Sequence, residues 1–342
     1  MRVAVTGGGG FLGSHLCEAL LRRGDEVVCL DDFSTGDPAN VAAFLEDPAF
    51  ELLVGDVSRT IDVPGVVDAV AHLASPASPP DYLGRPLETL AVGSRGTENA
   101  LRLATRHDAR FLLASTSEVY GDPEVHPQEE NYWGHVNPIG PRSVYDESKR
   151  FAEALTQAYR THLGANTGIV RIFNTYGPRM RPHDGRVVSN FVVQALAGEP
   201  LTVYGDGKQT RSFCYVDDLV RGILAMLDRD EPGPVNLGNP VELTVLKLAE
   251  HVLELTDSPA EIRFRPLPVD DPTRRRPVIA RAAERLGWVP EVGIEDGLRR
   301  TVHWFAGQLD AVTAAAAAIR GGQQGGVTAA WPRPSGATRS AS

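Results

Sequence analysis

Short apolar runs alternate with longer segments of helical periodicity through the first half of the chain. The apolar runs, which predict buried strands, are residues 2–6, 26–30, 50–54, 69–73, 110–115 and 168–173. Apolar residues at helical spacing predict helices over 14–23, 86–106 and 144–162. Strands that alternate with helices favour an α/β fold, a doubly wound parallel sheet of Rossmann type.

After about residue 177 the pattern loosens into short helices, isolated strands and loops rich in Pro and Gly. We therefore expect a Rossmann domain over 1–176 and a smaller mixed region over 177–310 that binds substrate. The segment 311–342 is predicted to be a helical extension, with the alanines 314–318 in the helix. The low-complexity tail from Gly321 is predicted to be disordered.

Composition narrows the class of protein. The chain has 342 residues and a formal net charge of -10, which argues against a general nucleic-acid binder. Cys17, Cys29 and Cys214 are far apart and odd in number, so we interpret them as reduced thiols rather than a disulfide framework. No signal peptide and no membrane-spanning segment are apparent, which predicts a cytoplasmic location. No zinc-type spacing occurs, so no metal is expected.

A glycine-rich turn links the first strand to the first helix, with Gly7, Gly10 and Gly13 at its key positions. Glycine permits a tight turn and a close backbone approach to pyrophosphate, and the helix N-terminus favours anions. Asp31 ends the second strand, where a carboxylate can accept both ribose hydroxyls and would repel a 2′-phosphate. The pattern therefore predicts an NAD site. Asp56 follows the third strand and is either an adenine-side contact or a simple turn residue.

Tyr145 and Lys149 are four residues apart in a helical pattern, so they share one face. A neighbouring ammonium and a positively charged nicotinamide ring both favour the tyrosine phenolate. Such a tyrosine can take a proton from a substrate hydroxyl while hydride leaves for NAD. Thr116 lies at a strand end, where ligands meet a doubly wound sheet, and can hydrogen-bond the reacting oxygen.

Several motifs together carry a resemblance to a known family. TGGGGFLG, STSEVYG, YDESK and RIFNTYGP resemble the extended short-chain dehydrogenase/reductases that act on sugar nucleotides. The longer stretches STSEVYGDPEVHPQEENYWGHVNPIGPRS, GPRMRPHDGRVVSNF and GEPLTVYGDGKQTRSF are more specific and resemble the UDP-glucuronate decarboxylases, also called UDP-xylose synthases. The resemblance covers about residues 2–305.

The resemblance implies a reaction in which the C4 hydroxyl of a hexuronate is oxidised to a ketone. Related dehydratases carry Asp-Glu where this chain has Ser117 and Glu118, and serine cannot readily expel a hydroxyl as water. A C4 ketone makes C6 a β-keto carboxylate, which loses carbon dioxide with little help. Glu118 is then either a proton-handling group near C4 and C5 or a structural carboxylate that holds its loop. Hydride return regenerates NAD and leaves UDP-xylose.

The resemblance also implies the contacts of cofactor and substrate. The catalytic residues are predicted to be Thr116, Glu118, Tyr145 and Lys149. The residues predicted to bind NAD are Gly7, Gly10, Phe11, Leu12, Gly13, Asp31, Asp32, Phe33, Thr35, Gly36, Asp56, Val57, Leu73, Ser75, Ala114, Tyr145, Lys149 and Thr175. Those predicted to bind UDP-glucuronate are Ser117, Glu118, Asn174, Arg179, Arg186, Val188, Tyr204, Arg211 and Arg275. Arg211 and Arg275 are the expected anion contacts, whereas His72 and His183 are expected to be non-catalytic.

The chain departs from the family pattern at several positions. Ser148 stands where the family usually has Gly, and Val278 replaces its usual Asp. Ala91-Val92-Gly93 stands where relatives usually show Lys-Thr-Asn, which affects how substrate or a neighbouring loop is held.

The residues also leave two other functions open. A uronate 4-epimerase would oxidise the same carbon and return hydride to the opposite face, although Ser117-Glu118 argues against it. A non-catalytic NAD-binding regulator would tend to lose Tyr145 or Lys149, and both are present. The resemblance also implies a homodimer through the 86–106 and 144–162 helices.

Overall fold

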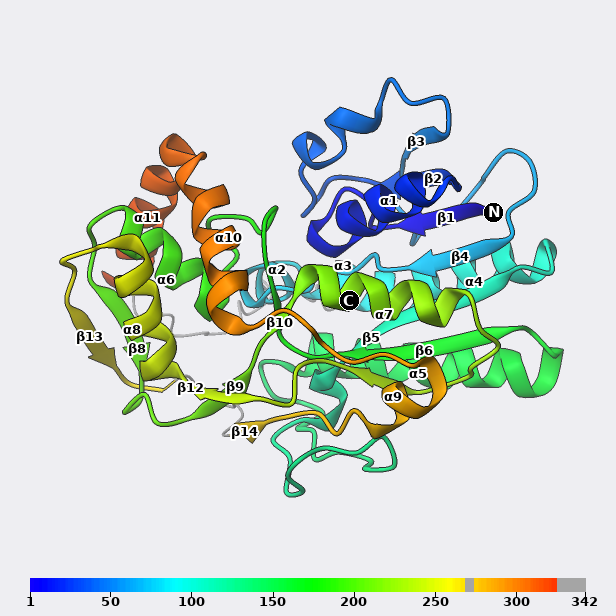
Figure 1. Cartoon of the computed structure of the whole chain (residues 1–342). Helices are drawn as coiled ribbons and strands as arrows, with labels where there is room; N and C mark the ends of the chain where they lie inside the picture. Colours follow the sequence, from blue (N-terminus) through cyan, green and yellow to red (C-terminus); the bar gives the residue numbers. More distant parts are fainter. Residues whose placement is uncertain (268–273, 325–342) are drawn as a thin grey trace, which may run out of the picture.

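A seven-stranded parallel sheet forms the centre of the molecule (Figure 1). The computed structural model describes residues 1–267 and 274–324. The strand order is β11-β6-β5-β4-β1-β2-β3, and every neighbouring pair is parallel. This is the α/β, doubly wound Rossmann-type sheet that the sequence predicts. The order reverses between β1 and β4, and such a switch point opens a crevice at the carboxyl ends of the strands.

The bounds of the elements are as follows. The strands are β1 Arg2–Thr6, β2 Glu26–Asp31, β3 Phe50–Val54, β4 Ala69–His72, β5 Arg110–Thr116, β6 Thr167–Ile172, β7 Thr175–Tyr176, β8 Leu201–Tyr204, β9 Thr210–Ser212, β10 Cys214–Tyr215, β11 Val235–Leu237, β12 Glu242–Thr244, β13 Ile262–Arg265 and β14 Arg274–Arg275. The helices are α1 Phe11–Arg23, α2 Pro79–Gly84, α3 Pro86–Ala91, α4 Thr97–Arg106, α5 Ser143–Leu163, α6 Val187–Leu196, α7 Val216–Leu227, α8 Val245–Thr256, α9 Ala280–Leu286, α10 Ile294–Ala306 and α11 Leu309–Gln324.

Alternating side chains of the strands supply two cores, one on each face of the sheet. Val3 and Val5 point into the core that α1 and α7 cover, whereas Ala4 points into the core beneath α4 and α5. Figure 1 shows α1 and α7 on the near side of the sheet. Because both faces are covered, the strands are apolar on both sides, which explains their continuous hydrophobic runs.

The structure refines one of the sequence predictions and corrects two. The segment 86–106 is helical throughout, as expected, but it consists of α3 and α4 joined by a π-helical turn, η3 (Val92–Gly96). Helix α1 begins at Phe11 rather than at residue 14, because Gly10 serves as its N-cap. Gly321 was expected to begin a disordered tail, but α11 continues to Gln324 through an alanine-rich stretch of high helix propensity. The remainder of the predicted tail lies outside the described residues.

The later part of the chain folds mainly beside the carboxyl ends of the strands. Helices α6, α8, α10 and α11 lie together with three small sheets, β10-β7, β12-β9-β14 and β13-β8. The same part returns once to the large sheet, where β11 pairs in parallel with β6. Within the described part of the chain, no helix is long and apolar enough to span a bilayer.

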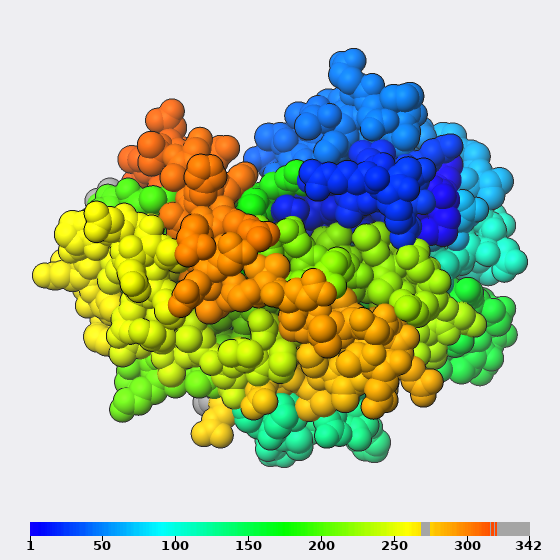
Figure 2. All heavy atoms as spheres, in the orientation of Figure 1, coloured from blue at the N-terminus to red at the C-terminus, as the bar shows by residue number. Residues whose placement is uncertain are grey.

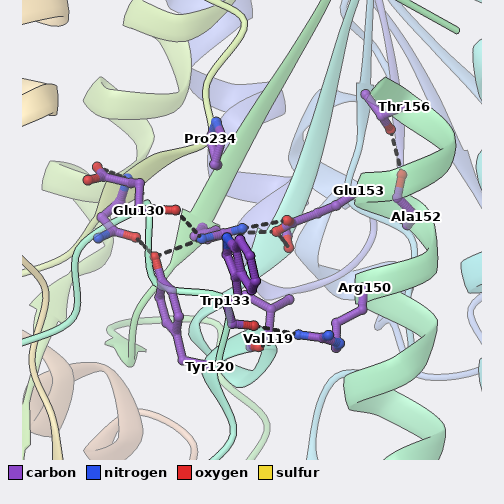
Figure 3. A network of polar contacts seen from close by, with 12 residues as sticks. Val119, Tyr120, Glu130, Trp133, Arg150, Ala152, Glu153, Thr156 and Pro234 are labelled. Carbon is purple, nitrogen blue, oxygen red and sulfur yellow. Dashed lines mark hydrogen bonds and ion pairs between the residues drawn. The ribbon is translucent and has the colours of Figure 1, made fainter. Parts of the chain in front are cut away.

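A polar network ties α5 to the strands beneath it (Figure 3). Glu153 of α5 accepts hydrogen bonds from Arg171 Nε at 2.9 Å and Arg171 Nη2 at 2.7 Å, and from Ser115 Oγ at 2.6 Å. Arg171 Nη1 donates to the hydroxyl of Tyr120 at 3.0 Å, and Tyr120 donates to Asn236 Oδ1 at 2.8 Å. The Glu153 carboxylate therefore links α5 to β5 and β6, and the network continues through Arg171 and Tyr120 to β11.

Glu153→Gln is expected to destabilise the protein by about 3 kcal/mol, because it leaves the Arg171 guanidinium without its counter-charge in a mostly buried place. Urea unfolding measures this change in the free energy of unfolding. The matched control is Glu147→Gln on the same helix, since Glu147 and Arg150 form a half-exposed pair at 3.7 Å that contributes less than about 1 kcal/mol. Equal effects of the two substitutions would contradict the role given to the buried pair.

Candidate active site

One large cleft of about 1630 Å³ runs along the carboxyl ends of the central strands. Its walls come from the ends of β1, β2, β4, β5 and β6 on one side and from α6, β8 and β9 on the other. On the face seen in Figure 2, the molecule is notched between the orange α10–α11 region and the blue N-terminal region. The sheet's switch point thus lies inside a cleft large enough for two extended ligands.

The glycine turn between β1 and α1 has the shape that a dinucleotide requires. A Cβ on Gly13 would lie 2.0 Å from the carbonyl oxygen of Gly7, so only glycine fits where helix and turn pack together. Gly7 itself has a φ of +74°, which favours glycine. Among the described residues, no side chain caps the first turn of α1 and no acidic residue lies in it, which leaves its positive end available to phosphates.

Asp31 is held in place at the end of β2 by two backbone groups. Its carboxylate oxygens accept from the N–H of Gly9 and from the N–H of Phe33, both at 2.8 Å. Burial raises the pKa of Asp31, and these two hydrogen bonds oppose that rise by stabilising the charged form. Asp31 and Asp32 both line the cleft, where a carboxylate suits ribose hydroxyls.

The structure brings nearly all of the predicted NAD contacts to the cleft wall. Those that line it are Gly7, Gly10, Phe11, Leu12, Gly13, Asp31, Asp32, Thr35, Gly36, Asp56, Val57, Leu73, Ser75, Ala114, Tyr145, Lys149 and Thr175. Phe33 is the exception, because its ring lies over Gly9 and does not line the cleft. Its contribution is the backbone N–H that holds Asp31.

Thr116, Tyr145 and Lys149 meet at the base of the cleft. Thr116 ends β5 and is hydrogen-bonded to the phenol of Tyr145. Lys149 Nζ donates to the carbonyl oxygen of Ala114 at 2.9 Å and lies 5.9 Å from the centre of the Tyr145 ring. Burial lowers the pKa of Lys149 to about 8, with Glu153 opposing that fall, so Lys149 is mostly an ammonium at neutral pH.

Without a bound cofactor, the phenol of Tyr145 is protonated at neutral pH. Burial raises its pKa to about 12, while the positive charge of Arg186 and the hydrogen bond with Thr116 act in the opposite direction. A bound cation close to the ring would therefore be needed to lower the pKa of Tyr145 toward neutral pH, where the phenolate can form. The positively charged nicotinamide ring is such a cation, and the cleft has room for it beside Tyr145.

Tyr82 stacks against Tyr145 and was missed by sequence reasoning. The two rings have centroids 5.2 Å apart and are nearly parallel, at 10°. Tyr82 is 2% exposed and belongs to α2, a short helix with no periodic pattern to single it out. The stack fixes the plane of the Tyr145 ring and excludes water from one of its faces.

Glu118 is clamped between two arginines. Its Oε2 accepts from Arg142 Nη2 at 2.7 Å, and its Oε1 is paired with Arg275 Nη1. Although burial acts in the opposite direction, the charges of Arg275 and Arg142 lower the pKa of Glu118 to about 2. Glu118 is therefore an ionised hydrogen-bond acceptor at neutral pH, which argues against a role as a proton donor or general base and leaves a role in orienting neighbouring groups.

The predicted substrate contacts all line the cleft: Ser117, Glu118, Asn174, Arg179, Arg186, Val188, Tyr204, Arg211 and Arg275. All four of these arginines have contacts within the protein. Arg179 Nη2 pairs with Glu18 of α1 at 2.5 Å, and Arg275 pairs with Glu118 and donates to the carbonyl oxygen of Gly121 at 2.7 Å. Arg275 therefore neutralises Glu118, in addition to any contact it makes with an anion.

The two histidines expected to be non-catalytic differ in position. His72 is fully buried, contacts the hydroxyl oxygens of Thr6 and Thr97, and has a pKa lowered to about 3 by burial, so it is neutral. His183 lines the cleft. In residues 1–267 and 274–324, no cluster of His, Cys, Asp and Glu is arranged to hold a metal ion.

Two positions at which the chain departs from the family pattern, Gly93 and Ser148, lie against each other. A Cβ on Gly93, in the π-helical turn η3, would lie 2.5 Å from the Cβ of Ser148 in α5. The family usually has Asn at the first position and Gly at the second, so each arrangement places one side chain in the same gap. Ser148 Oγ also donates to the carbonyl oxygen of Tyr145 at 2.7 Å, which places this contact directly behind the catalytic face of α5.

We expect Gly93→Asn alone to destabilise the protein by about 1–3 kcal/mol, because α5 must move away from η3 to accept the side chain. Ser148→Gly should cost about 1 kcal/mol, and the double variant should recover most of the loss caused by Gly93→Asn. Urea unfolding of the four proteins measures the coupling. Gly84→Asn is the control, since among the described residues nothing beyond its own stretch of helix lies within 4 Å of a Cβ there. Additive effects of the two substitutions would exclude the proposed compensation.

The comparison with protein families agrees with this geometry. Residues 3–238 match the profile described as the NAD dependent epimerase/dehydratase family. The chain belongs to this family. Its members are NAD-dependent, and the glycine turn and Asp31 line a cleft whose geometry suits a dinucleotide.

Curated relatives within the family are similar over most of their length. UDP-glucuronic acid decarboxylase 1 of Xenopus tropicalis is 52% identical over 309 residues, which cover 90% of this chain and 73% of that protein. UDP-glucuronic acid decarboxylase 4 of Arabidopsis thaliana is 56% identical over 307 residues, which cover 89% of this chain and 68% of that protein.

Solved structures of the family share the fold. UDP-glucose 4-epimerase of Thermotoga maritima, with UDP-glucose, has a TM-score of 0.82 at 28% identity and covers 90% of this chain and 100% of that one. UDP-glucuronic acid 4-epimerase of Bacillus cereus, in complex with UDP-glucuronic acid and NAD, has a TM-score of 0.80 at 28% identity with the same coverage.

Proposed function

We propose that this chain is a UDP-glucuronate decarboxylase that forms UDP-xylose and regenerates NAD in each turnover. The observation that carries the proposal is the meeting of Thr116, Tyr145 and Lys149 at the base of the cleft, next to Ser117. The identity of 52% to 56% with proteins named UDP-glucuronic acid decarboxylase supports the same substrate.

The residues of the cleft suit the oxidation of a sugar hydroxyl. NAD, when bound, accepts the C4 hydride of the sugar and later returns it. Tyr145 takes the hydroxyl proton, Thr116 orients the reacting oxygen, and the Lys149 ammonium stabilises the phenolate. The proton held on Tyr145 returns to the C4 oxygen when the ketone is reduced again.

The decarboxylation itself needs little from the protein. Once C4 is a ketone, the bond from C5 to the carboxylate carbon breaks, carbon dioxide leaves, and the electron pair passes into the ketone as an enolate. A proton from solvent water then adds at C5. Ser117 has no acidic proton with which to expel a hydroxyl as water, and Glu118 is ionised, so both favour decarboxylation over dehydration.

A second candidate is a UDP-uronate 4-epimerase. The structural likeness to the Bacillus cereus epimerase with UDP-glucuronic acid favours it. An epimerase must turn the keto sugar over within the cleft and must retain the carboxylate. The two functions therefore give products of different mass. A non-catalytic NAD-binding regulator is the remaining alternative and would show no turnover at all.

Incubation with NAD and UDP-glucuronate labelled in its carboxylate is expected to release labelled carbon dioxide and a UDP-pentose. Tyr145→Phe should reduce the rate by about 10²–10⁴-fold, because the proton acceptor is lost. Tyr159→Phe, which alters a tyrosine on the same helix outside the cleft, is the control and should keep the wild-type rate. A product of unchanged mass would establish the epimerase, and full turnover by Tyr145→Phe would exclude the mechanism.

We also propose a homodimer in the cytoplasm. Leu90 of α3 and Phe151 of α5 are 39% and 50% exposed, and the two helices pack beside each other, so their outer faces offer an apolar surface to a second copy. The three cysteines are free and buried, which supports a reducing compartment.

Light scattering is expected to give twice the 36.8 kDa chain mass. Leu90→Glu combined with Phe151→Glu should give the single mass, because charges would be buried at the interface. Leu45→Glu changes an exposed leucine away from these helices and should leave the dimer intact. A monomeric wild type would refute the dimer without affecting the proposed chemistry.

A further inference from the structure

Helix α11 lies beyond residue 305, where the resemblance to the decarboxylases ends, and it has one apolar face. Val312, Ala316 and Ile319 are spaced by four and three residues, so they lie on the same side of the helix. Val312 is 0% and Ala316 is 2% exposed, whereas Thr313 on another side is exposed. This periodicity identifies α11 as a docked helix.

The apolar face of α11 packs against α6, which forms part of the cleft wall. Val188 and Phe191 of α6 are buried in the same core as Val312 and Ala316, and both line the cleft. Ile319 packs against this core and reaches the cleft itself. Figure 1 shows α11 and α6 together on the left of the view, whereas β1 and β2 lie on the right. The part of the wall to which α6 and α11 contribute is thus on the side away from β1 and β2.

The chemistry of this end of the cleft is that of a site for a planar heterocycle. Phe191, Tyr204 and Ile319 offer apolar surface. The side-chain oxygens of Asn190 and Gln209 are buried, and neither has a hydrogen-bond partner within the part of the chain that the structure describes. Because a buried acceptor without a partner is costly, these two amide oxygens are suited to N–H donors of a ligand.

We propose that Ile319 of α11 contacts the base of the sugar nucleotide and contributes to its binding. This inference rests on the proposed function, since it takes the ligand to be a nucleoside diphosphate sugar. The base takes no part in hydride transfer, so the contact is the same before and after that step. Uniform binding of this kind lowers KM and leaves kcat unchanged.

Ile319→Ala is expected to raise KM for UDP-glucuronate, and Kd for UDP, by about five- to tenfold, because part of an apolar contact is lost. The kcat should stay within about twofold of the wild type. Thr313→Ala is the matched control on an outward side of α11 and should change neither constant. An unchanged Kd for UDP in Ile319→Ala would overturn the proposal.

A second comparison separates direct contact from a loosened helix. Val312→Ala weakens the seam between α11 and α6 but does not remove a residue from the cleft wall. It should leave Kd for UDP near the wild-type value, and an increase equal to that of Ile319→Ala would show that the effect is indirect and refute the contact. Pyrophosphate, measured by calorimetry as a probe without a base, should bind Ile319→Ala and wild type equally. An equal loss for pyrophosphate and UDP would also refute the contact.

The two proposals can fail separately. Calorimetry with UDP requires no turnover, so a protein that binds UDP through Ile319 but releases no carbon dioxide would contradict the proposed function alone. A wild type that decarboxylates UDP-glucuronate, with UDP affinity insensitive to Ile319→Ala, would contradict the further inference alone.

Discussion

The ion pair between Glu153 and Arg171 fixes helix α5 on the sheet, and the catalytic face depends on that position. Tyr145, Lys149 and Glu153 follow one another at four-residue spacing, so they lie on one side of α5. Glu153 binds Arg171 of β6 and Ser115 of β5, next to Thr116. The same carboxylate also supports the charge of Lys149 against burial. One pair thus sets both the position of the helix and the ionisation of its lysine.

Several arginines line the cleft, although the chain as a whole has a net charge of -10. Arg142 and Arg275 hold Glu118 as a carboxylate, and Arg179 is balanced by Glu18 of α1. Because these charges are already paired, the wall has a defined geometry before any ligand arrives. An acidic net charge is therefore compatible with an anionic substrate.

Local patterns predicted the parts of the site that lie on regular elements. The glycine turn, Asp31, Thr116, Tyr145 and Lys149 occupy strand ends and one long helix, where periodicity and strand order fix their place. Tyr82 lies on a short helix with no such pattern, so its stacking on Tyr145 depends on tertiary packing.

The ion pairs of Glu118 with Arg142 and Arg275 could not be predicted from the sequence either. Arg142 and Arg275 are 133 residues apart in the numbering and meet only in the folded chain. The clamp makes Glu118 an ionised acceptor, which the sequence had left open. Ser148 and Gly93 looked like separate departures until the structure brought them into contact.

The return of β11 to the large sheet makes the two parts of the chain interdependent. Strand β6 ends at Ile172, but its outer edge is closed only by Val235–Leu237, which follow about sixty residues later. A nascent chain that has emerged only as far as β6 carries an open edge, and open edges pair with other chains. Synthesis of the later part of the chain, which covers the cleft, therefore also completes the sheet. The nucleotide-binding part cannot finish folding before that later part has been made.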